Sequence, residues 1–157
     1  MLDAELLGFL LRARAAMFGT RMDQEAMPPD LERFAQNYGS APGCMLAARD
    51  ADGRVVGSIA CRPYDHRFAH LHYDARGVVE VVRLFVVPEL RRQGLAQALF
   101  HQLQAWAAQQ DVHTLYLHTH PFLPGAITFW QRMGFRLLCV DDDPLWQTTH
   151  MDRPAAA

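Results

Sequence analysis

Residues 78–108 read VVEVVRLFVVPELRRQGLAQALFHQLQAWAA, and this stretch decides the fold. Its first ten residues are β-branched or apolar apart from Glu80 and Arg83. Such a run is typical of a central strand covered on both faces, and it ends at Pro88, which cannot donate a hydrogen bond to a sheet. Apolar side chains then recur at three- and four-residue spacing, at Leu95, Ala98, Leu99, Leu103 and Trp106. The stretch therefore predicts a strand, a loop and an amphipathic helix of about four turns.

The loop at 91–96 opens this helix and reads RRQGLA. Small residues at Gly94 and Ala96 let a ligand approach the backbone, and the first-turn N–H groups have no partner inside the helix. The helix dipole adds partial positive charge there, and Arg91 and Arg92 add two full charges. The loop therefore predicts a site for a phosphate or pyrophosphate. On the loop alone a second interpretation stays open, in which Gly94 only eases a turn beside a solvated arginine pair.

The order of strand, Pro-Glu-x-Arg-x-x-Gly-x-Ala and helix resembles the acetyl-CoA signature of the GNAT superfamily of N-acetyltransferases, which is Gln/Arg-x-x-Gly-x-Gly/Ala. The matching positions are Arg91, Gly94 and Ala96. Downstream, residues 126–135 (AITFWQRMGF) are similar to the family's Ala-x-x-x-Tyr-x-x-x-Gly-Phe segment. Upstream, residues 44–62 read as two strands around an Asp-Ala-Asp-Gly turn and resemble the family's first hairpin. The resemblance covers roughly residues 5–140.

This resemblance implies a single α/β (α+β) domain, which we place at residues 1–153, followed by a disordered tail at 154–157. It implies a mixed, mostly antiparallel central sheet of about six to seven strands. Helices would flank the sheet, and the sheet would splay at the strand that binds acetyl-CoA. A chain of 157 residues suits one domain with a sizeable core.

Outside the motifs, hydrophobic spacing predicts a helix at 2–17 and a short helix at 28–38 that begins at two prolines. The acidic run at 141–144 predicts a turn between two last strands, at 136–140 and 145–151.

The resemblance also implies acetyl-CoA as the co-substrate and indicates which residues would hold it. The pyrophosphate would lie on the loop residues Arg91, Arg92, Gln93, Gly94, Leu95 and Ala96. The pantetheine arm would bond to the main chain of Leu84, Phe85 and Val86. Trp130 stands where many members have a tyrosine that protonates the leaving thiolate, and an indole N–H is not a practical proton source. Either the thiolate leaves unaided, or Tyr116 or a water helps.

Acyl transfer to an amine needs a group that takes a proton from the ammonium. Glu80 lies eleven positions before Arg91, where some family members carry a catalytic glutamate, and the resemblance implies that it is the general base. We expect burial to raise its pKa and help it accept a proton. The alternative is an ion pair with Arg83 or a neighbouring strand, although period-two alternation puts Glu80 and Arg83 on opposite faces. His118 and His120 are rival bases, since imidazole titrates near neutrality.

We therefore expect an acetyl-CoA-dependent N-acetyltransferase that acetylates a primary amine of a small molecule or peptide by direct attack. The acidic residues Asp65, Asp74 and Glu80 favour a cationic acceptor. By the resemblance, the residues that line its pocket, or simply belong to the core, are Phe18, Met22, Met27, Phe34 and Tyr38. The second hypothesis is a non-catalytic acyl-CoA sensor, because Trp130 and Leu123 replace the family's tyrosine and asparagine.

Several histidines raise the question of a metal. The candidate pairs are His70 with His72 and His118 with His120, with Asp65 and Asp74 as carboxylates. No local spacing matches a structural zinc pattern, so we expect no metal.

Composition limits the partners. A net charge of −2 and a pI near 6.4 argue against a general nucleic-acid or anionic-membrane surface, and no apolar run is long enough to span a membrane. The three cysteines, Cys44, Cys61 and Cys139, are widely spaced and fit core packing in a reduced, cytoplasmic protein. We expect no signal peptide, and by the resemblance a homodimer.

Overall fold

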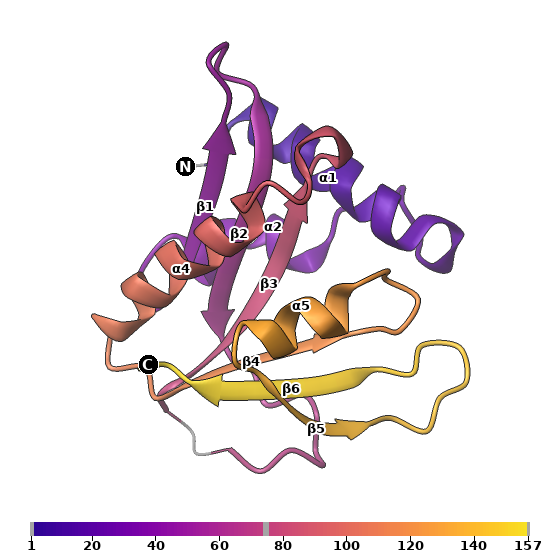
Figure 1. Cartoon of the computed structure of the whole chain (residues 1–157), viewed down its shortest axis with the longest axis vertical. Helices are drawn as coiled ribbons and strands as arrows, with labels where there is room; N and C mark the ends of the chain where they lie inside the picture. The colour runs from indigo at the N-terminus through magenta and orange to yellow at the C-terminus, as the bar shows by residue number, and fades with distance from the viewer. Residues whose placement is uncertain (1, 74–75, 157) are drawn as a thin grey trace.

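The computed structural model describes residues 2–73 and 76–156, and it combines helices with a central β-sheet (Figure 1). The helices are α1 (Ala4–Phe18), α2 (Pro29–Glu32), α3 (Phe34–Tyr38), α4 (Leu95–Ala108) and α5 (Ala126–Arg132), with 3₁₀ turns at Gly19–Arg21 and Pro88–Leu90. The strands are β1 (Cys44–Arg49), β2 (Val55–Pro63), β3 (Val78–Val86), β4 (Thr114–Thr119), β5 (Arg136–Val140) and β6 (Thr149–Pro154). Within the described residues, no helix has the length and apolar character needed to cross a bilayer.

These strands form a six-stranded sheet in the order β1-β2-β3-β4-β6-β5 over the described ranges. Every neighbouring pair is antiparallel except β3 and β4, which run parallel. The parallel pairing covers only three positions, from Val78 opposite Thr114 to Glu80 opposite Tyr116. Beyond that point the two strands separate, and the sheet opens into two halves (Figure 1). The prediction of a mixed, mostly antiparallel sheet that splays at β3 is confirmed.

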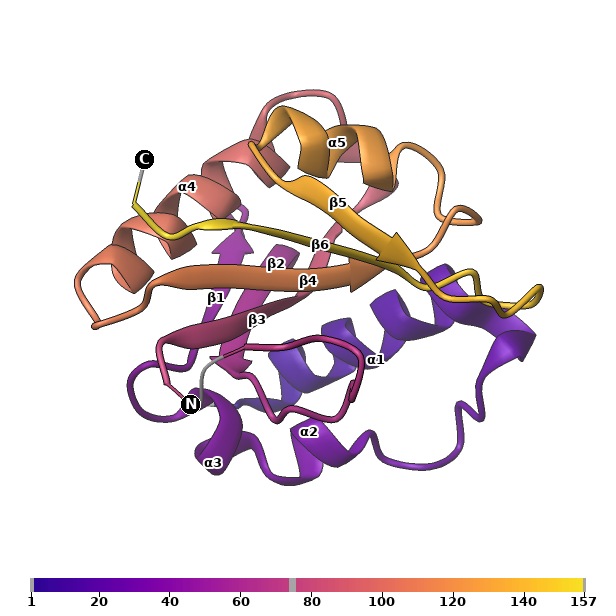
Figure 2. The same cartoon turned by 90° about the horizontal axis from the view of Figure 1, so that it is seen from below.

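Two layers of helices cover the sheet. Helices α4 and α5 lie on one face, whereas α1, α2, α3 and the loop at 64–73 lie on the other (Figure 2). Of the predicted apolar stripe of α4, Leu99 and Leu103 are buried in the core between this helix and the sheet, whereas Ala98 is exposed. Phe100 and Ala107, which were not in the predicted stripe, are buried there as well. Helix α4 packs closely on β2 at Gly57, where an added Cβ would lie 3.2 Å from Leu99. The opposite core lies between α1 and strands β2 and β3.

Strand β3 is bulged in its middle. Ser58 pairs with Phe85 and Ala60 with Val82, so Arg83 and Leu84 together oppose one residue of β2. Arg83 has φ +59°. The extra residue shifts the side-chain alternation by one position. Both Val82 and Phe85 therefore pack in the core beside α1, although strict alternation would place them on opposite faces.

Because of the bulge, the side chain of Arg83 points to a different face of the sheet from the one that was predicted. Its guanidinium bonds to Asp30, just before the middle of α2, with Nε–Oδ2 and Nη2–Oδ1 distances of 2.7 Å. Glu80 bonds to Arg67 of the loop at 64–73, which covers the same face. The prediction that Glu80 and Arg83 point to opposite faces was therefore wrong, because the period of two does not hold through a bulge.

Three other boundaries differ from the sequence predictions. The helix expected at 28–38 is interrupted at Arg33 and forms α2 and α3. The last strand begins at Thr149 because the turn is longer: Asp143 accepts a hydrogen bond from Leu145 N–H, and Gln147 has φ +45°. The first two residues of the tail that was expected to be disordered, Pro154 and Ala155, are ordered against the sheet. Pro154 ends β6, and the buried Ala155 donates its N–H to the His113 carbonyl.

Candidate active site

A cleft of about 1960 Å³ opens where β3 and β4 separate. Its walls are the bulged part of β3, the end of β4, the first turn of α4 and the segment at 122–133. The end of α1 and the loop that follows it close the other side. A groove formed by separated strands exposes backbone groups that would otherwise pair within the sheet, so it can hold an extended polar ligand.

One end of the cleft is suited to an anion. Gly94 caps α4 with φ +84°, and no side chain caps this helix end. A Cβ at Gly94 would meet nothing within 4 Å. The first-turn N–H groups therefore face open space, with the exposed Arg91 and Arg92 beside them. Among the described residues, neither arginine makes a salt bridge with a carboxylate.

Most of the predicted pyrophosphate residues line this end of the cleft: Arg91, Arg92, Gly94, Leu95 and Ala96. Gln93 is the exception, since its amide turns back to the Glu89 carbonyl at 3.3 Å. The side chain of Arg91 also makes contacts within the protein. Its Nε donates to the Val86 carbonyl at 2.9 Å, and its guanidinium lies 5.1 Å from the centre of the Phe85 ring.

The predicted pantetheine residues Leu84, Phe85 and Val86 all line the cleft. The N–H of Val87 donates to Val56 on β2. Because peptide groups alternate along a strand, those of Val86 point the other way, toward the cleft. This stretch of β3 has no β4 partner, since the pairing ends at Glu80.

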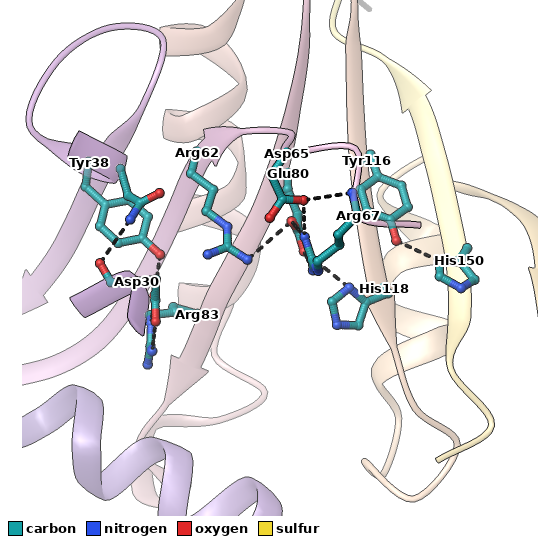
Figure 3. Close-up of polar contacts among 11 residues, drawn as sticks. Asp30, Tyr38, Arg62, Asp65, Arg67, Glu80, Arg83, Tyr116, His118 and His150 are labelled. Carbon is teal, nitrogen blue, oxygen red and sulfur yellow. Dashed lines mark hydrogen bonds and ion pairs between the residues drawn. The ribbon is translucent and has the colours of Figure 1, made fainter. Parts of the chain in front are cut away.

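Glu80 lies at the point where the strands part and is fully buried. Arg67 holds both carboxylate oxygens, with Nη1–Oε1 at 2.7 Å and Nη2–Oε2 at 2.8 Å. Arg62, opposite Glu80 on β2, reaches Oε1 at 3.4 Å, and Nδ1 of His118 lies 3.2 Å from Oε2 (Figure 3). The ion pair with a neighbouring strand that the sequence suggested is present, since Arg62 belongs to β2. The shorter ion pair is with Arg67, which lies in a loop and was not considered from the sequence.

This environment reverses the expected pKa shift of Glu80. Burial by itself raises the pKa, but the hydrogen bonds from Arg67 and the adjacent His118 outweigh it and hold the pKa of Glu80 well below its ordinary value. The expectation of a raised pKa was wrong because the sequence does not show that Arg67 folds back onto this strand. Glu80 is therefore an ionised group at neutral pH and a weak base.

The two candidate histidines of β4 differ in their surroundings. His118 lines the cleft, and its side chain is 26% exposed. Its Nδ1 is buried and makes no well-aligned hydrogen bond within the described residues, although it lies close to Glu80. His120 also lines the cleft but stacks on Phe122 and contacts the Trp146 carbonyl through Nδ1 at 3.0 Å. Burial lowers the pKa of His120, so this ring is neutral at pH 7.

Tyr116 does not line the cleft. It is fully buried on β4 beneath the loop at 64–73, and its hydroxyl lies 2.6 Å from Nδ1 of His150 (Figure 3). Burial and the nearby Glu80 raise its pKa above its ordinary value. The structure therefore does not bring Tyr116 to the place where a thiolate would leave.

Trp130 forms part of the cleft wall but belongs mainly to the core. It is 7% exposed and meets Phe100 and Phe135 edge to face, with ring centres 5.7 Å and 5.2 Å apart. Leu123, at the family's asparagine position, also lines the cleft.

The end of the cleft away from α4 is aromatic and basic. Phe18 contacts His120, Phe122 and Trp146, with ring centres 6.0–6.3 Å apart, and Arg21 lies over Phe122. Of the pocket residues expected from the sequence, Phe18 and Met22 line the cleft; Met27, Phe34 and Tyr38 are not part of its lining. Asp74 lies outside the described residues.

Sequence reasoning missed the cleft residues Arg62, Arg67, Phe122 and Trp146. Arg67 and Trp146 stand in loops without a motif, so no local pattern marks them. Arg62 was visible as the charged residue at the end of an apolar strand.

A sheet that splays between parallel strands, with an open helix N-terminus at the resulting cleft, defines the GNAT acetyltransferase fold. The family model for the acetyltransferase (GNAT) family matches residues 11–135, and the chain belongs to this family. Uncharacterized N-acetyltransferase YjgM of Escherichia coli K12 is 26% identical over 152 residues, which are 96% of this chain and 84% of the relative.

Two solved structures show the same fold. An acetyltransferase of the GNAT family from Staphylococcus aureus Mu50 aligns with a TM-score of 0.77 at 22% identity, over 96% of this chain and 91% of its own. A phosphinothricin acetyltransferase from Sinorhizobium meliloti, solved in complex with AcCoA, aligns with a TM-score of 0.73 at 21% identity, over 98% and 85%.

Proposed function

We propose that the protein is an acetyl-CoA-dependent N-acetyltransferase that acetylates a primary amine. The observation that carries this proposal is one continuous cleft with two chemically different ends. The anion-binding turn of α4 lies at one end, and the pair of Glu80 and His118 lies where β3 and β4 part. Such a cleft suits a long anionic thioester and an acceptor that approaches its acyl end from the other side.

In this reaction the amine nitrogen forms a bond to the thioester carbonyl carbon, and the carbon–sulfur bond then breaks. The ammonium gives one proton to a base before it attacks, and the nitrogen gives a second proton to solvent as the tetrahedral intermediate collapses to the amide. The thiolate leaves without needing an acid because it is weakly basic. The backbone groups of Leu84 and Val86 and the α4 turn would hold the thioester. This agrees with the absence of Tyr116 from the cleft lining and with the packed position of Trp130.

We assign the base to His118 and give Glu80 a different role from that expected. His118 is accessible from the cleft, whereas Glu80 is fully buried and kept ionised by Arg67. A carboxylate beside an imidazole orients the ring and stabilises the imidazolium that forms when the ring takes a proton. Glu80 is therefore the charged partner, and His118 makes the proton contact with the acceptor amine.

The charges of the cleft also favour an acceptor that carries an anionic group. Arg67 bridges Asp65 and Glu80, so neither carboxylate is available to a cationic substrate. The acceptor side contributes two carboxylates to the lining, Asp30 and Glu80. Against them stand five arginines, Arg14, Arg21, Arg62, Arg67 and Arg83. An amine with a carboxylate, such as an amino acid, fits this excess better than a polyamine.

The test begins with calorimetric titration of the full chain with acetyl-CoA, and with pantetheine as the control that lacks the pyrophosphate. Thiol release is then followed over a panel of amino acids and polyamines. Tight acetyl-CoA binding with release on amino acids supports the proposal. Binding without release on any amine favours the sensor, and absence of binding overturns the assignment of the cleft.

His118→Gln tests the base. It should lower kcat by about a hundredfold or more while acetyl-CoA affinity changes little. His101→Gln, an exposed histidine of α4, is the matched control and should leave both unchanged. Equal turnover in the two variants would remove His118 from the mechanism.

A further inference from the structure

Four side chains outside the cleft converge on one point. They are His70, Cys139, Asp141 and His150, and their ligand atoms all lie within 4.8 Å of one another. None of the four lines the cleft. His150 is fully buried, Asp141 and Cys139 are partly exposed, and His70 is about half exposed. The group is therefore buried on its inner side and open to solvent on its outer side.

The sheet itself places three of these residues together. Cys139 on β5 pairs directly with His150 on β6. Asp141 lies two residues after Cys139, and its N–H still donates to Thr148 across the hairpin at 2.8 Å. Residues two apart on a strand share a face, so Cys139 and Asp141 flank His150. The loop at 64–73 covers this face (Figure 2) and adds His70 as the fourth side chain.

We propose that these four residues bind one divalent metal ion, with zinc as the ion that best fits the donors. Two imidazole nitrogens, one thiolate and one carboxylate oxygen make a four-ligand set of the kind that holds zinc tetrahedrally. Nε2 of His150 and Nε2 of His70 lie 2.9 Å and 3.1 Å from the same oxygen of Asp141. The side chains of His70, Asp141 and His150 therefore already point toward one common position, which a metal ion could occupy.

The second ring nitrogen of His150 supports this reading. Its Nδ1 lies 2.6 Å from the hydroxyl of the buried Tyr116. A proton on Nδ1, donated to this oxygen, leaves the lone pair of Nε2 free for a metal, which is the usual outer contact of a metal-binding histidine. Without a metal, Asp141 accepts from both imidazoles, and that hydrogen bonding requires no contribution from Cys139.

The site would fasten the loop at 64–73 to the β5–β6 hairpin. Arg67 of this loop holds Glu80, Phe68 packs between His118 and His150, and His70 reaches the metal ligands. Ring centres of Phe68 and His150 are 4.8 Å apart. A metal here is therefore structural, and it holds Arg67 in place from outside the cleft.

This proposal replaces the expectation that the chain holds no metal, and it uses other pairings than those read from the sequence. His72 is exposed and lies apart from the four residues, and His118 and His120 face the cleft. The sequence could not show the site, because His70 comes from a loop that is far in the chain from the β5–β6 hairpin, which carries the other three ligands.

The test measures zinc directly. The full chain is stripped with a chelator and titrated with zinc against a coloured competitor, and the cobalt(II) form is examined for a thiolate-to-metal absorption band. We expect one zinc per chain and a band that requires Cys139. Because zinc must displace the thiol proton, binding should weaken as the pH falls. A chain that takes up no zinc would overturn the proposal.

Four variants locate the ion. Cys139→Ser and His70→Ala, at positions that are not fully buried, should weaken zinc binding by at least about tenfold. Cys44→Ser and His72→Ala are the matched controls and should bind as the parent does. Loss of zinc on Cys44→Ser would place the ion at the Cys44–Cys61 pair, whose sulfurs are 3.7 Å apart, and would refute the site. Equal affinity in all four variants would refute it as well.

Discussion

Arg67 and Glu80 form a two-pronged ion pair, at 2.7 Å and 2.8 Å, between a loop and the strand position at which the sheet splits. Glu80 is fully buried, so its charge depends on this partner. The pair therefore links the conformation of the loop at 64–73 to the floor of the cleft. It also explains why the carboxylate stays ionised at a position where burial alone would protonate it.

Glu80→Gln should destabilise the fold by about 3 kcal/mol at pH 7, because it removes the buried charge partner of Arg67 and leaves only the exposed Asp65 beside its guanidinium. The pKa of Glu80 is lowered in the folded state, so its stabilising contribution is complete above the unfolded value of about 4.3. The contribution is lost as the pH falls below that value. Denaturant unfolding at pH 7 and pH 3 should show the parent and variant converging at the lower pH.

Asp65→Asn is the control for this pair. Asp65 binds the same arginine at 2.9 Å but is 54% exposed, so its loss should cost at most about 1 kcal/mol. If both substitutions cost the same, the buried contact with Glu80 does not hold the loop.

Gly94→Glu should weaken CoA binding by at least about tenfold. The new side chain has free space, so the variant folds, but it places bulk and negative charge beside the first turn of α4. Titration with CoA measures the loss. Pantetheine has no pyrophosphate, so its binding should change much less.

Gly53→Glu separates strain from charge in this experiment. Gly53 has the same φ of +84° and equally open surroundings, but it lies in the β1–β2 turn. Both substitutions should carry the same backbone cost, about 1–2 kcal/mol. Weakened CoA binding in the Gly53 variant would mean that stability, not the loop, controls the affinity.

Trp130→Tyr introduces the hydroxyl that many family members have. We expect it to lower stability by about 1–2 kcal/mol, because the smaller ring loses contacts with Phe100 and Phe135. We expect no gain in kcat. Thermal melting and thiol release measure the two effects, with Trp130→Phe as the control without a hydroxyl. A clear rise in kcat for tyrosine over phenylalanine would show that an acid is missing here.

The strand, the anion loop and helix α4 could be predicted because each depends on local sequence. Apolar periodicity sets β3 and α4, and the conformation of Gly94 and the two neighbouring arginines set the loop. The cleft also follows once the family is identified, since Leu84 to Val86 line it as expected.

The charges of the site could not be predicted because they depend on distant segments. The pKa direction of Glu80 is decided by Arg67, thirteen residues away in a loop without a motif. Arg83, at the bulge, bonds to Asp30, which is 53 residues away in the chain. An alternating pattern does not show that one residue is inserted, and for this reason the expected faces of Glu80 and Arg83 were wrong.

Asp30→Asn tests whether this distant contact sets the bulge. Arg83 is 14% exposed, and its backbone has an unfavourable positive φ. The side chain holds Asp30 at two points, and the Arg83 carbonyl accepts a hydrogen bond from Ser58 at 2.7 Å. Loss of the carboxylate leaves a buried cation unpaired and should cost about 3 kcal/mol.

The same variant should weaken CoA binding, because the positions of Leu84 and Val86 depend on the bulge. Asp52→Asn removes an exposed partner of Arg54 and should change neither stability nor CoA affinity appreciably. Denaturant unfolding and CoA titration on both variants provide the comparison. If Asp30→Asn unfolds more easily but binds CoA as the parent does, the bulge persists without Asp30, and Ser58 alone is sufficient to hold it.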